Sequence, residues 1–121
     1  MKAQAQKYLA ELFGTFILVF VGSASIIALL KAGFGAGILI TVPLAFGFGL
    51  MAGLYAFAEV SGGHFNPAVS LAMFLDRRLS VVDLVAYWLF QIAGGVIASA
   101  VLGGLYLVRF LTMRLTRSHN V

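Results

Sequence analysis

The sequence has no cysteine, and only 10% of its 121 residues are charged. The absence of cysteine excludes disulfides, thiolate nucleophiles and zinc sites of the Cys type, and it leaves the redox compartment undetermined. A soluble domain carries about 25% charged and about 45–50% apolar residues, whereas 62% of this chain is hydrophobic and its mean hydropathy is +1.06. This composition predicts one compact unit embedded in a lipid bilayer.

The few charges are mostly positive, since eight Lys and Arg outnumber four Asp and Glu and the net charge is +4. Such a balance can indicate nucleic-acid binding. The basic residues are scattered, however, at the ends of apolar runs, where they anchor membrane spans and set their orientation. We therefore expect a lipid bilayer as the partner of this chain and no nucleic acid.

Apolar runs fill most of the chain, over residues 9–30, 38–60 and 82–108. One bilayer crossing takes about 20 residues, so the runs predict an all-α membrane protein with three transmembrane helices in a single unit over residues 1–121. The first run continues well past a possible cleavage site at residues 23–25. We therefore expect a retained membrane helix and not a signal peptide.

Small residues recur four positions apart in all three runs, a spacing that lets helix backbones approach closely inside a membrane. Chance is the alternative explanation, because the chain has 14 glycines. We expect three packing faces, made by Ala10 with Gly14, by Gly49 with Gly53, and by Gly95 with Ser99 and Gly103.

A fourth apolar stretch, residues 67–75, is too short to cross, because a helix of that length measures about 13 Å. Before it stand Asn66, a favoured N-cap, and Pro67, a favoured first helical residue. Residues 61–75 form either a surface loop or a re-entrant loop and half-helix that dips into the membrane and returns. The cap, the proline and two glycines favour the second, since irregular backbone at membrane depth lines a watery cavity or is buried in protein.

Residues 61–70 read S-G-G-H-F-N-P-A-V-S and resemble the first Asn-Pro-Ala box of the aquaporin and glycerol-facilitator family, the major intrinsic proteins. The stretches A-E-L-F-G-T-F at residues 10–16 and L-A-F-G-F-G at residues 44–49 resemble the first two spans of that family. The resemblance covers only the first half of a usual member, one half of an inverted repeat. It implies a passive channel with no enzymatic activity, no cofactor and no metal.

The resemblance also implies which residues line the pore. The side-chain amide of Asn66 would donate a hydrogen bond to a passing water, and the start of the half-helix would repel cations. The expected pore motif is Asn66, Pro67 and Ala68, and the expected acceptors are the carbonyls of Gly62, Gly63, His64 and Phe65. Water and small neutral solutes are the expected permeants, and the choice between water and glycerol stays open.

The resemblance also implies roles for three more residues. Phe46 stands where the family places an aromatic ring of its selectivity filter, and Leu50 lies one turn further on. A phenylalanine there resembles the water-selective members, and the alternative is an ordinary buried aromatic. Glu11 is expected to hold the re-entrant loop, by accepting hydrogen bonds from its backbone or from His64. The alternative is a glutamate that reaches the membrane interface.

The second box of the family is followed by an arginine that completes the filter, whereas Val69 follows the only box of this chain. A lone half would leave its loop facing lipid, which hydrogen bonding forbids. A separate chain can supply the other half, or two copies can pair antiparallel as a homodimer. The basic residues favour the dimer, because they are divided evenly between the two sides and set no orientation: Lys2, Lys7, Arg77 and Arg78 against Lys31, Arg109, Arg114 and Arg117.

Other functions stay open beside the channel. The chain can be a non-conducting accessory or structural subunit, or a truncated fragment of a full channel. A small dual-topology exporter needs a carboxylate at the membrane centre, whereas Glu11 and Glu59 lie near the ends of spans. Glu59 receives no role. We expect a multi-pass protein of the cell (plasma or inner) membrane, and the sequence does not decide whether residues 109–121 extend the third helix.

Overall fold

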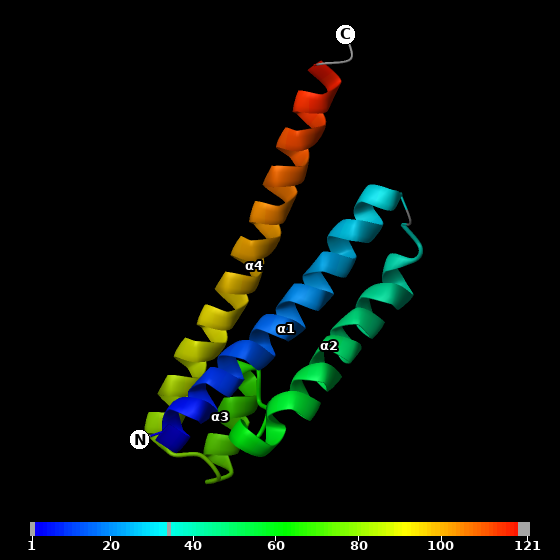
Figure 1. Ribbon diagram of the computed structural model, residues 1–121. Coiled ribbons are helices and arrows are strands. Elements are labelled where there is room, and N and C mark those ends of the chain that lie inside the picture. Colours follow the sequence, from blue (N-terminus) through cyan, green and yellow to red (C-terminus); the bar gives the residue numbers. More distant parts are fainter. Residues whose placement is uncertain (1, 34, 119–121) are drawn as a thin grey trace.

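The computed structural model describes residues 2–33 and 35–118. Within them the chain forms four helices (Figure 1), which are α1 (Lys2–Ala32), α2 (Ile38–Ser61), α3 (Pro67–Leu75) and α4 (Val81–Ser118). Helices α1, α2 and α4 are long and apolar enough to cross a membrane, whereas α3 is short. The predicted all-α fold with three spans and one short helix is confirmed.

Two of the long helices extend well beyond the predicted spans. Helix α1 begins at Lys2, because the polar residues that precede the first apolar run are mostly strong helix formers. Helix α4 continues to Ser118, so the segment after residue 108 extends the third helix as far as it is described, and residues 119–121 lie outside the described part. With 38 residues, α4 is about 57 Å long, well over the ~30 Å hydrocarbon core of a bilayer.

Helix α1 is the centre of the arrangement, because it packs against both α2 and α4. After α2 the chain turns back along the bundle, and α3 then returns to the end of the molecule at which α4 begins (Figure 1). Helix α3 packs against α4. The segment between α2 and α4 therefore enters the bundle and leaves it at the same end, which is the path expected for a re-entrant loop.

The two predicted small-residue faces of α1 and α2 meet each other. Ala10, Gly14, Gly49 and Gly53 are all buried. A Cβ atom on Gly49 would lie 3.4 Å from the Cα atom of Leu18, so the two helices approach almost to backbone contact. This part of the prediction is confirmed.

The predicted face on α4 is wrong for contacts within the chain. Ser99 is exposed, and a Cβ atom on Gly103 would meet nothing within 4 Å. The close contact is made by Gly94, where a Cβ atom would collide with the carbonyl oxygen of Leu12 in α1. The four-residue spacing of small residues placed the packing face one residue too far along α4. The side of α4 that meets α1 is determined by packing and not by spacing alone.

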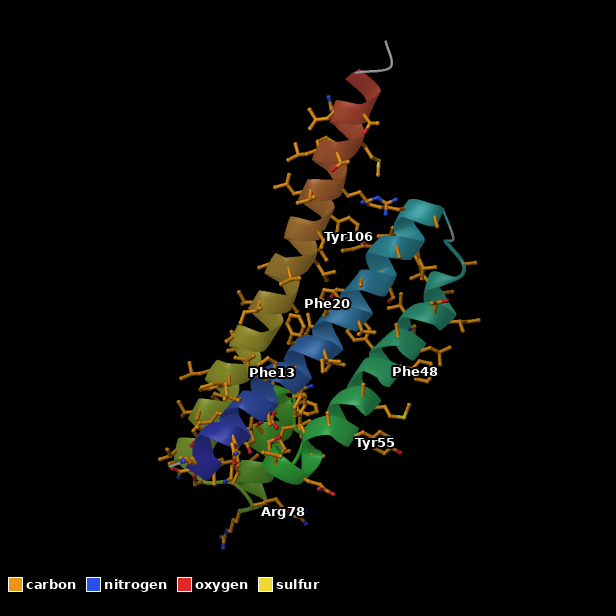
Figure 2. All side chains as sticks on the ribbon, in the orientation of Figure 1. Phe13, Phe20, Phe48, Tyr55, Arg78 and Tyr106 are labelled. Atoms are coloured by element: carbon orange, nitrogen blue, oxygen red, sulfur yellow. The ribbon has the colours of Figure 1, made fainter. Side chains whose placement is uncertain are left out.

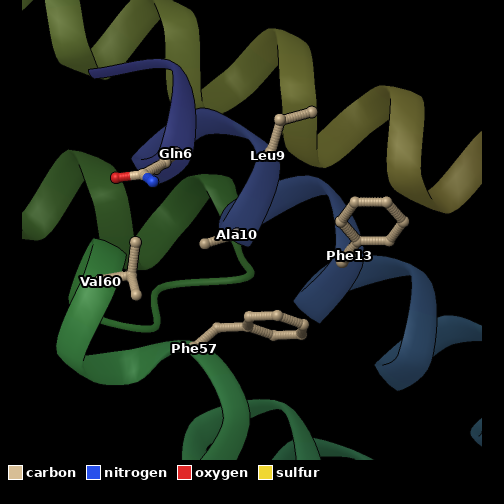
Figure 3. Close-up of a pocket in the computed structure, with 6 residues that line it drawn as sticks. All are labelled: Gln6, Leu9, Ala10, Phe13, Phe57 and Val60. Atoms are coloured by element: carbon tan, nitrogen blue, oxygen red, sulfur yellow. The ribbon is translucent and has the colours of Figure 1, made fainter. Parts of the chain in front are cut away.

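Most large apolar side chains point away from the other helices. Phe48 and Tyr55 project from the outer side of α2 (Figure 2), and Tyr55 is 87% exposed. Between the start of α1 and the end of α2 lies a shallow apolar groove of about 290 Å³ (Figure 3), in which the rings of Phe13 and Phe57 stack. A chain that exposes so much apolar surface needs an apolar surrounding, as expected for a membrane protein.

The close contact at Gly94 yields a stability prediction. Gly94→Ala forces α1 and α4 apart, and overpacking of this kind costs about 1–3 kcal/mol. Gly103→Ala is the matched control, since its surroundings are open and alanine is the better helix former. Unfolding by sodium dodecyl sulfate in mixed micelles measures both changes. Equal stability of the two variants would contradict the described packing of α1 on α4.

Candidate functional site

The site is built on the segment that links α2 to α3. Helix α2 ends at Ser61, and Gly62 and Gly63 follow with φ angles of 89° and 66°. Residues with a side chain rarely adopt this left-handed region, whereas glycine does so without strain. The two glycines thus reverse the chain direction, and the next residues run back into the bundle in non-helical form.

A single carboxylate holds this segment. Glu11 of α1 is fully buried. Its Oε1 accepts hydrogen bonds from the hydroxyl of Ser61 (2.7 Å) and the backbone N–H of His64 (2.9 Å). Its Oε2 accepts from the backbone N–H of Phe65 (2.6 Å) and the side-chain amide of Gln91 (2.8 Å). Two backbone donors that have no helical partner are thereby satisfied, and hydrogen bonds to an ionised group are among the strongest in proteins.

A second set of polar contacts ties the same segment to α4. Gln91 also donates to the hydroxyl of Ser70 in α3 (2.9 Å), which lies 3.0 Å from Nδ1 of His64. The phenol of Tyr87 donates to the carbonyl of Ser61 (2.6 Å), and its ring meets the His64 ring edge-on at 5.1 Å. Sequence reasoning missed Ser70, Tyr87 and Gln91. Gln91 carried a signal, because it is the only side-chain amide in the third apolar run and a buried amide needs partners.

The side chain of Phe65 packs between α1 and α2 and anchors the segment there. Phe65 is 2% exposed, and a Cβ atom on Gly14 would collide with its ring, while one on Gly53 would lie 3.1 Å from it. The φ angle of Phe65 is 46°, an unfavourable value for a residue with a side chain. Packing against the two glycines holds it there, so the small residues of both helices serve the loop as well as each other.

The tip of the segment is a capped helix start. Asn66 is the N-cap of α3, and its side-chain oxygen accepts from the N–H of Ala68 (2.9 Å). Pro67 is the first helical residue, and its carbonyl accepts from the indole of Trp88 (2.9 Å). Asn66, Pro67 and Ala68 are all exposed, and the Asn66 amide nitrogen donates to no described residue. A hydrogen-bond donor therefore stands free at the end of the loop.

Unused acceptors precede this donor. No described residue donates to the carbonyl oxygens of Gly62, Gly63, His64 and Phe65. Their N–H groups are satisfied, because Gly62 donates to the Ala58 carbonyl and the other three donate to Ser61 or Glu11. The segment is thus held by its donors, and its acceptors have no partner among the described residues.

The remaining predicted positions lie along α2. Phe46 is half-buried against α1, with its ring where a side chain on Gly22 would be. Leu50 is 38% exposed one turn nearer the loop, and Leu54, a further turn on, closely approaches Gly63. Phe46 therefore does not contact the loop, and Leu50 and Leu54 lie between them. Glu59 is exposed and makes no hydrogen bond or ion pair with a described residue.

The described residues form no cluster of metal-ligand side chains. No three His, Cys, Asp or Glu side chains among them gather closely enough to hold a metal ion. Among the residues that the structure describes, Glu11 has the only buried carboxylate, and four hydrogen bonds use it as an acceptor. What the segment offers is four carbonyl oxygens, at residues 62–65, to which no described residue donates, followed in the sequence by the Asn66 amide.

Comparison with known proteins decides the family. The family model of the major intrinsic proteins matches residues 1–120. The chain belongs to the major intrinsic protein family. The members of this family are channels and not enzymes, and membership together with the three apolar spans makes the chain a multi-pass integral membrane protein.

The curated relatives of this major intrinsic protein include proteins named as aquaporins and one named as a glycerol uptake facilitator-like protein. The chain is 44% identical to the glycerol uptake facilitator protein-like 6 of Lactiplantibacillus plantarum, over 78% of this chain and 41% of that one. It is 48% identical to aquaporin Z of Brucella melitensis, over 79% and 42%, and 45% identical to a probable TIP-type alpha aquaporin of Phaseolus vulgaris, over 78% and 38%. The chain thus spans about two fifths of the length of these relatives.

The hydrogen bonds of Glu11 predict a large effect of its replacement. Glu11→Gln removes the charge and turns an amide group toward donors, and one hydrogen bond to a charged group contributes about 1.5–3 kcal/mol. We expect a loss of stability of at least this size on unfolding in mixed micelles. Glu59→Gln is the control and should change stability by under about 0.5 kcal/mol, because exposed sites rarely matter more. Similar losses in both variants would show that Glu11 does not hold the loop.

Proposed function

We propose that this chain forms one wall of a membrane pore that conducts water and small neutral solutes passively. The observation that carries the proposal is a series of four consecutive carbonyl oxygens, at residues 62–65, without a described donor, followed in the sequence by the Asn66 amide nitrogen, which donates to no described residue. A permeant that both donates and accepts hydrogen bonds can pass along such a series by exchanging one partner for the next. Family membership supports the same function.

The proposed mechanism uses each part of the loop for one task. The carbonyls of Gly62, Gly63, His64 and Phe65 accept from passing water and replace the hydrogen bonds that it loses on leaving bulk. The amide of Asn66 donates to the water oxygen. The start of α3, at Pro67 and Ala68, carries a partial positive charge that disfavours cations. No covalent bond forms or breaks, so the process is conduction.

We assign the rest of the wall to α2. Leu50 and Leu54 continue from the loop along the exposed side of the helix, and Phe46 narrows the passage beyond them, in the role that the family gives to this position. Glu11 supports the loop from behind. An aromatic ring with apolar neighbours favours small neutral permeants over ions, which agrees with relatives named as an aquaporin and as a glycerol uptake facilitator protein-like protein.

We further propose that a second copy of this chain, inserted antiparallel, completes the pore. The exposed tip of α3 and the free carbonyls need a cover, since unsatisfied polar backbone is not tolerated against lipid. An in-plane twofold axis would bring two such tips together, as in transporters built from inverted repeats. The even division of basic residues between the two ends permits both orientations. The cell membrane is the proposed location of this assembly.

Osmotic swelling of vesicles tests conduction by the purified chain alone. We expect water permeability above that of empty vesicles, because the second copy supplies the other wall. Leu50→Trp should lower it to the level of empty vesicles by filling the passage. Leu89→Trp is the control, since Leu89 is exposed on α4, and it should conduct like the unaltered chain.

The outcomes separate the proposed roles. Conduction that Leu50→Trp abolishes and Leu89→Trp spares supports a pore along α2. Conduction that appears only when a longer relative is added to the vesicles would replace the antiparallel pair by an accessory role. Permeability no greater than that of empty vesicles in both conditions would contradict the channel.

A further inference from the structure

A second cavity lies behind the loop, at the end of the bundle where α2 ends and α4 begins. Its volume is about 370 Å³. Two cationic side chains line it, those of Lys7 and Arg78. Its other polar or loop members are Ser61, Gly62, His64 and Tyr87. No carboxylate is among the described residues that line it. The proposed pore uses the carbonyls of the loop and leaves this cavity without a role.

Both cations keep free donors. The ammonium of Lys7 is 4.0 Å from a carboxylate oxygen of Asp83, and Nε of Arg78 is 2.7 Å from one of Asp76. The Lys7 and Arg78 side chains are 40% and 70% exposed, so water screens both pairs. An ammonium has three donors and a guanidinium has five, which leaves most of them available. Arg78 projects from the lower end of the molecule (Figure 2).

A third donor comes from His64, and hydrogen bonds determine which ring nitrogen supplies it. The Ser70 hydroxyl accepts from Gln91 and is 3.0 Å from Nδ1 of His64. Because this hydroxyl already accepts from Gln91, we assign its own hydrogen to Nδ1 of His64. The neutral ring then carries its proton on Nε2. His64 is 9% exposed, and Nε2 donates to no described residue.

We propose that this cavity binds a phosphate group. Asp83 and Asp76 pair with the two cations from outside the cavity, and the donors that the cations keep, together with one N–H of His64, match the acceptor oxygens of a phosphate. The volume lies within the range of about 300–1,000 Å³ that small-molecule sites occupy, so a substituted phosphate fits better than a bare ion. The charged residues around it mark the end of the apolar spans, which is the level of lipid headgroups. The source is an anionic lipid or a soluble phosphate, and the site does not depend on the pore.

Binding is measured on the full chain in neutral detergent, with two probes. Native mass spectrometry compares phosphatidylglycerol with phosphatidylcholine, and equilibrium dialysis measures radiolabelled inorganic phosphate at constant ionic strength. We expect Lys7→Gln and Arg78→Gln each to weaken binding about tenfold, because each removes a charge-assisted hydrogen bond. Arg77→Gln is the matched control, since Arg77 carries the same charge in the same turn but does not line the cavity.

The outcomes identify the source or overturn the site. Tight binding of phosphatidylglycerol alone assigns the cavity to a lipid headgroup, and binding of inorganic phosphate as well assigns it to soluble phosphates. Binding by neither probe overturns the proposal. So does an equal loss of affinity in Arg77→Gln and Arg78→Gln, because that would reveal attraction by net charge and not a site. Vesicle permeability is a separate measurement, so failure here leaves the channel proposal unaffected.

Discussion

The Glu11 carboxylate is the interaction on which the rest of the structure depends. The loop after α2 must abandon helical hydrogen bonds to turn back into the bundle, and each backbone N–H left without a partner costs free energy in an apolar surrounding. Glu11 accepts from two of these groups and from Ser61 and Gln91. The burial of one charge is thus offset by four hydrogen bonds, and one side chain of α1 determines the path of a segment over 50 residues away.

Satisfaction of the donors has a consequence for the acceptors. Glu11 and Ser61 accept from the N–H groups of the loop, whereas no described residue donates to the carbonyl oxygens of residues 62–65. The same asymmetry occurs at the tip, where the Asn66 oxygen caps α3 and its amide nitrogen stays free. The proposed conduction and the stability of the loop therefore depend on different atoms of the same residues. Backbone acceptors without a donor are not tolerated against lipid, which is why the proposed pore needs a second protein surface.

The sequence predicted the local features well, because they depend on neighbours along the chain. The lengths of the apolar runs predicted the three spans, and Asn66 followed by Pro67 predicted the start of α3. The sequence did not predict contacts between residues far apart in the chain, such as Gln91 with Glu11 or Tyr87 with Ser61. The contact of Gly94 with α1 was not predicted for a related reason. A four-residue spacing fits several faces of one helix, and only packing against another helix selects among them.

The central claim is that the start of α3 lies inside the membrane assembly, next to a path that admits small molecules and excludes bulky ones. The chain has no cysteine, so single cysteines at Ala68 and, as an exposed comparison, at Arg77 can be labelled in intact membranes opened to both sides. The account predicts that a small methanethiosulfonate reagent modifies both, whereas a bulky membrane-impermeant maleimide modifies only the cysteine at Arg77. Labelling of both positions by the bulky reagent at equal rates would contradict it.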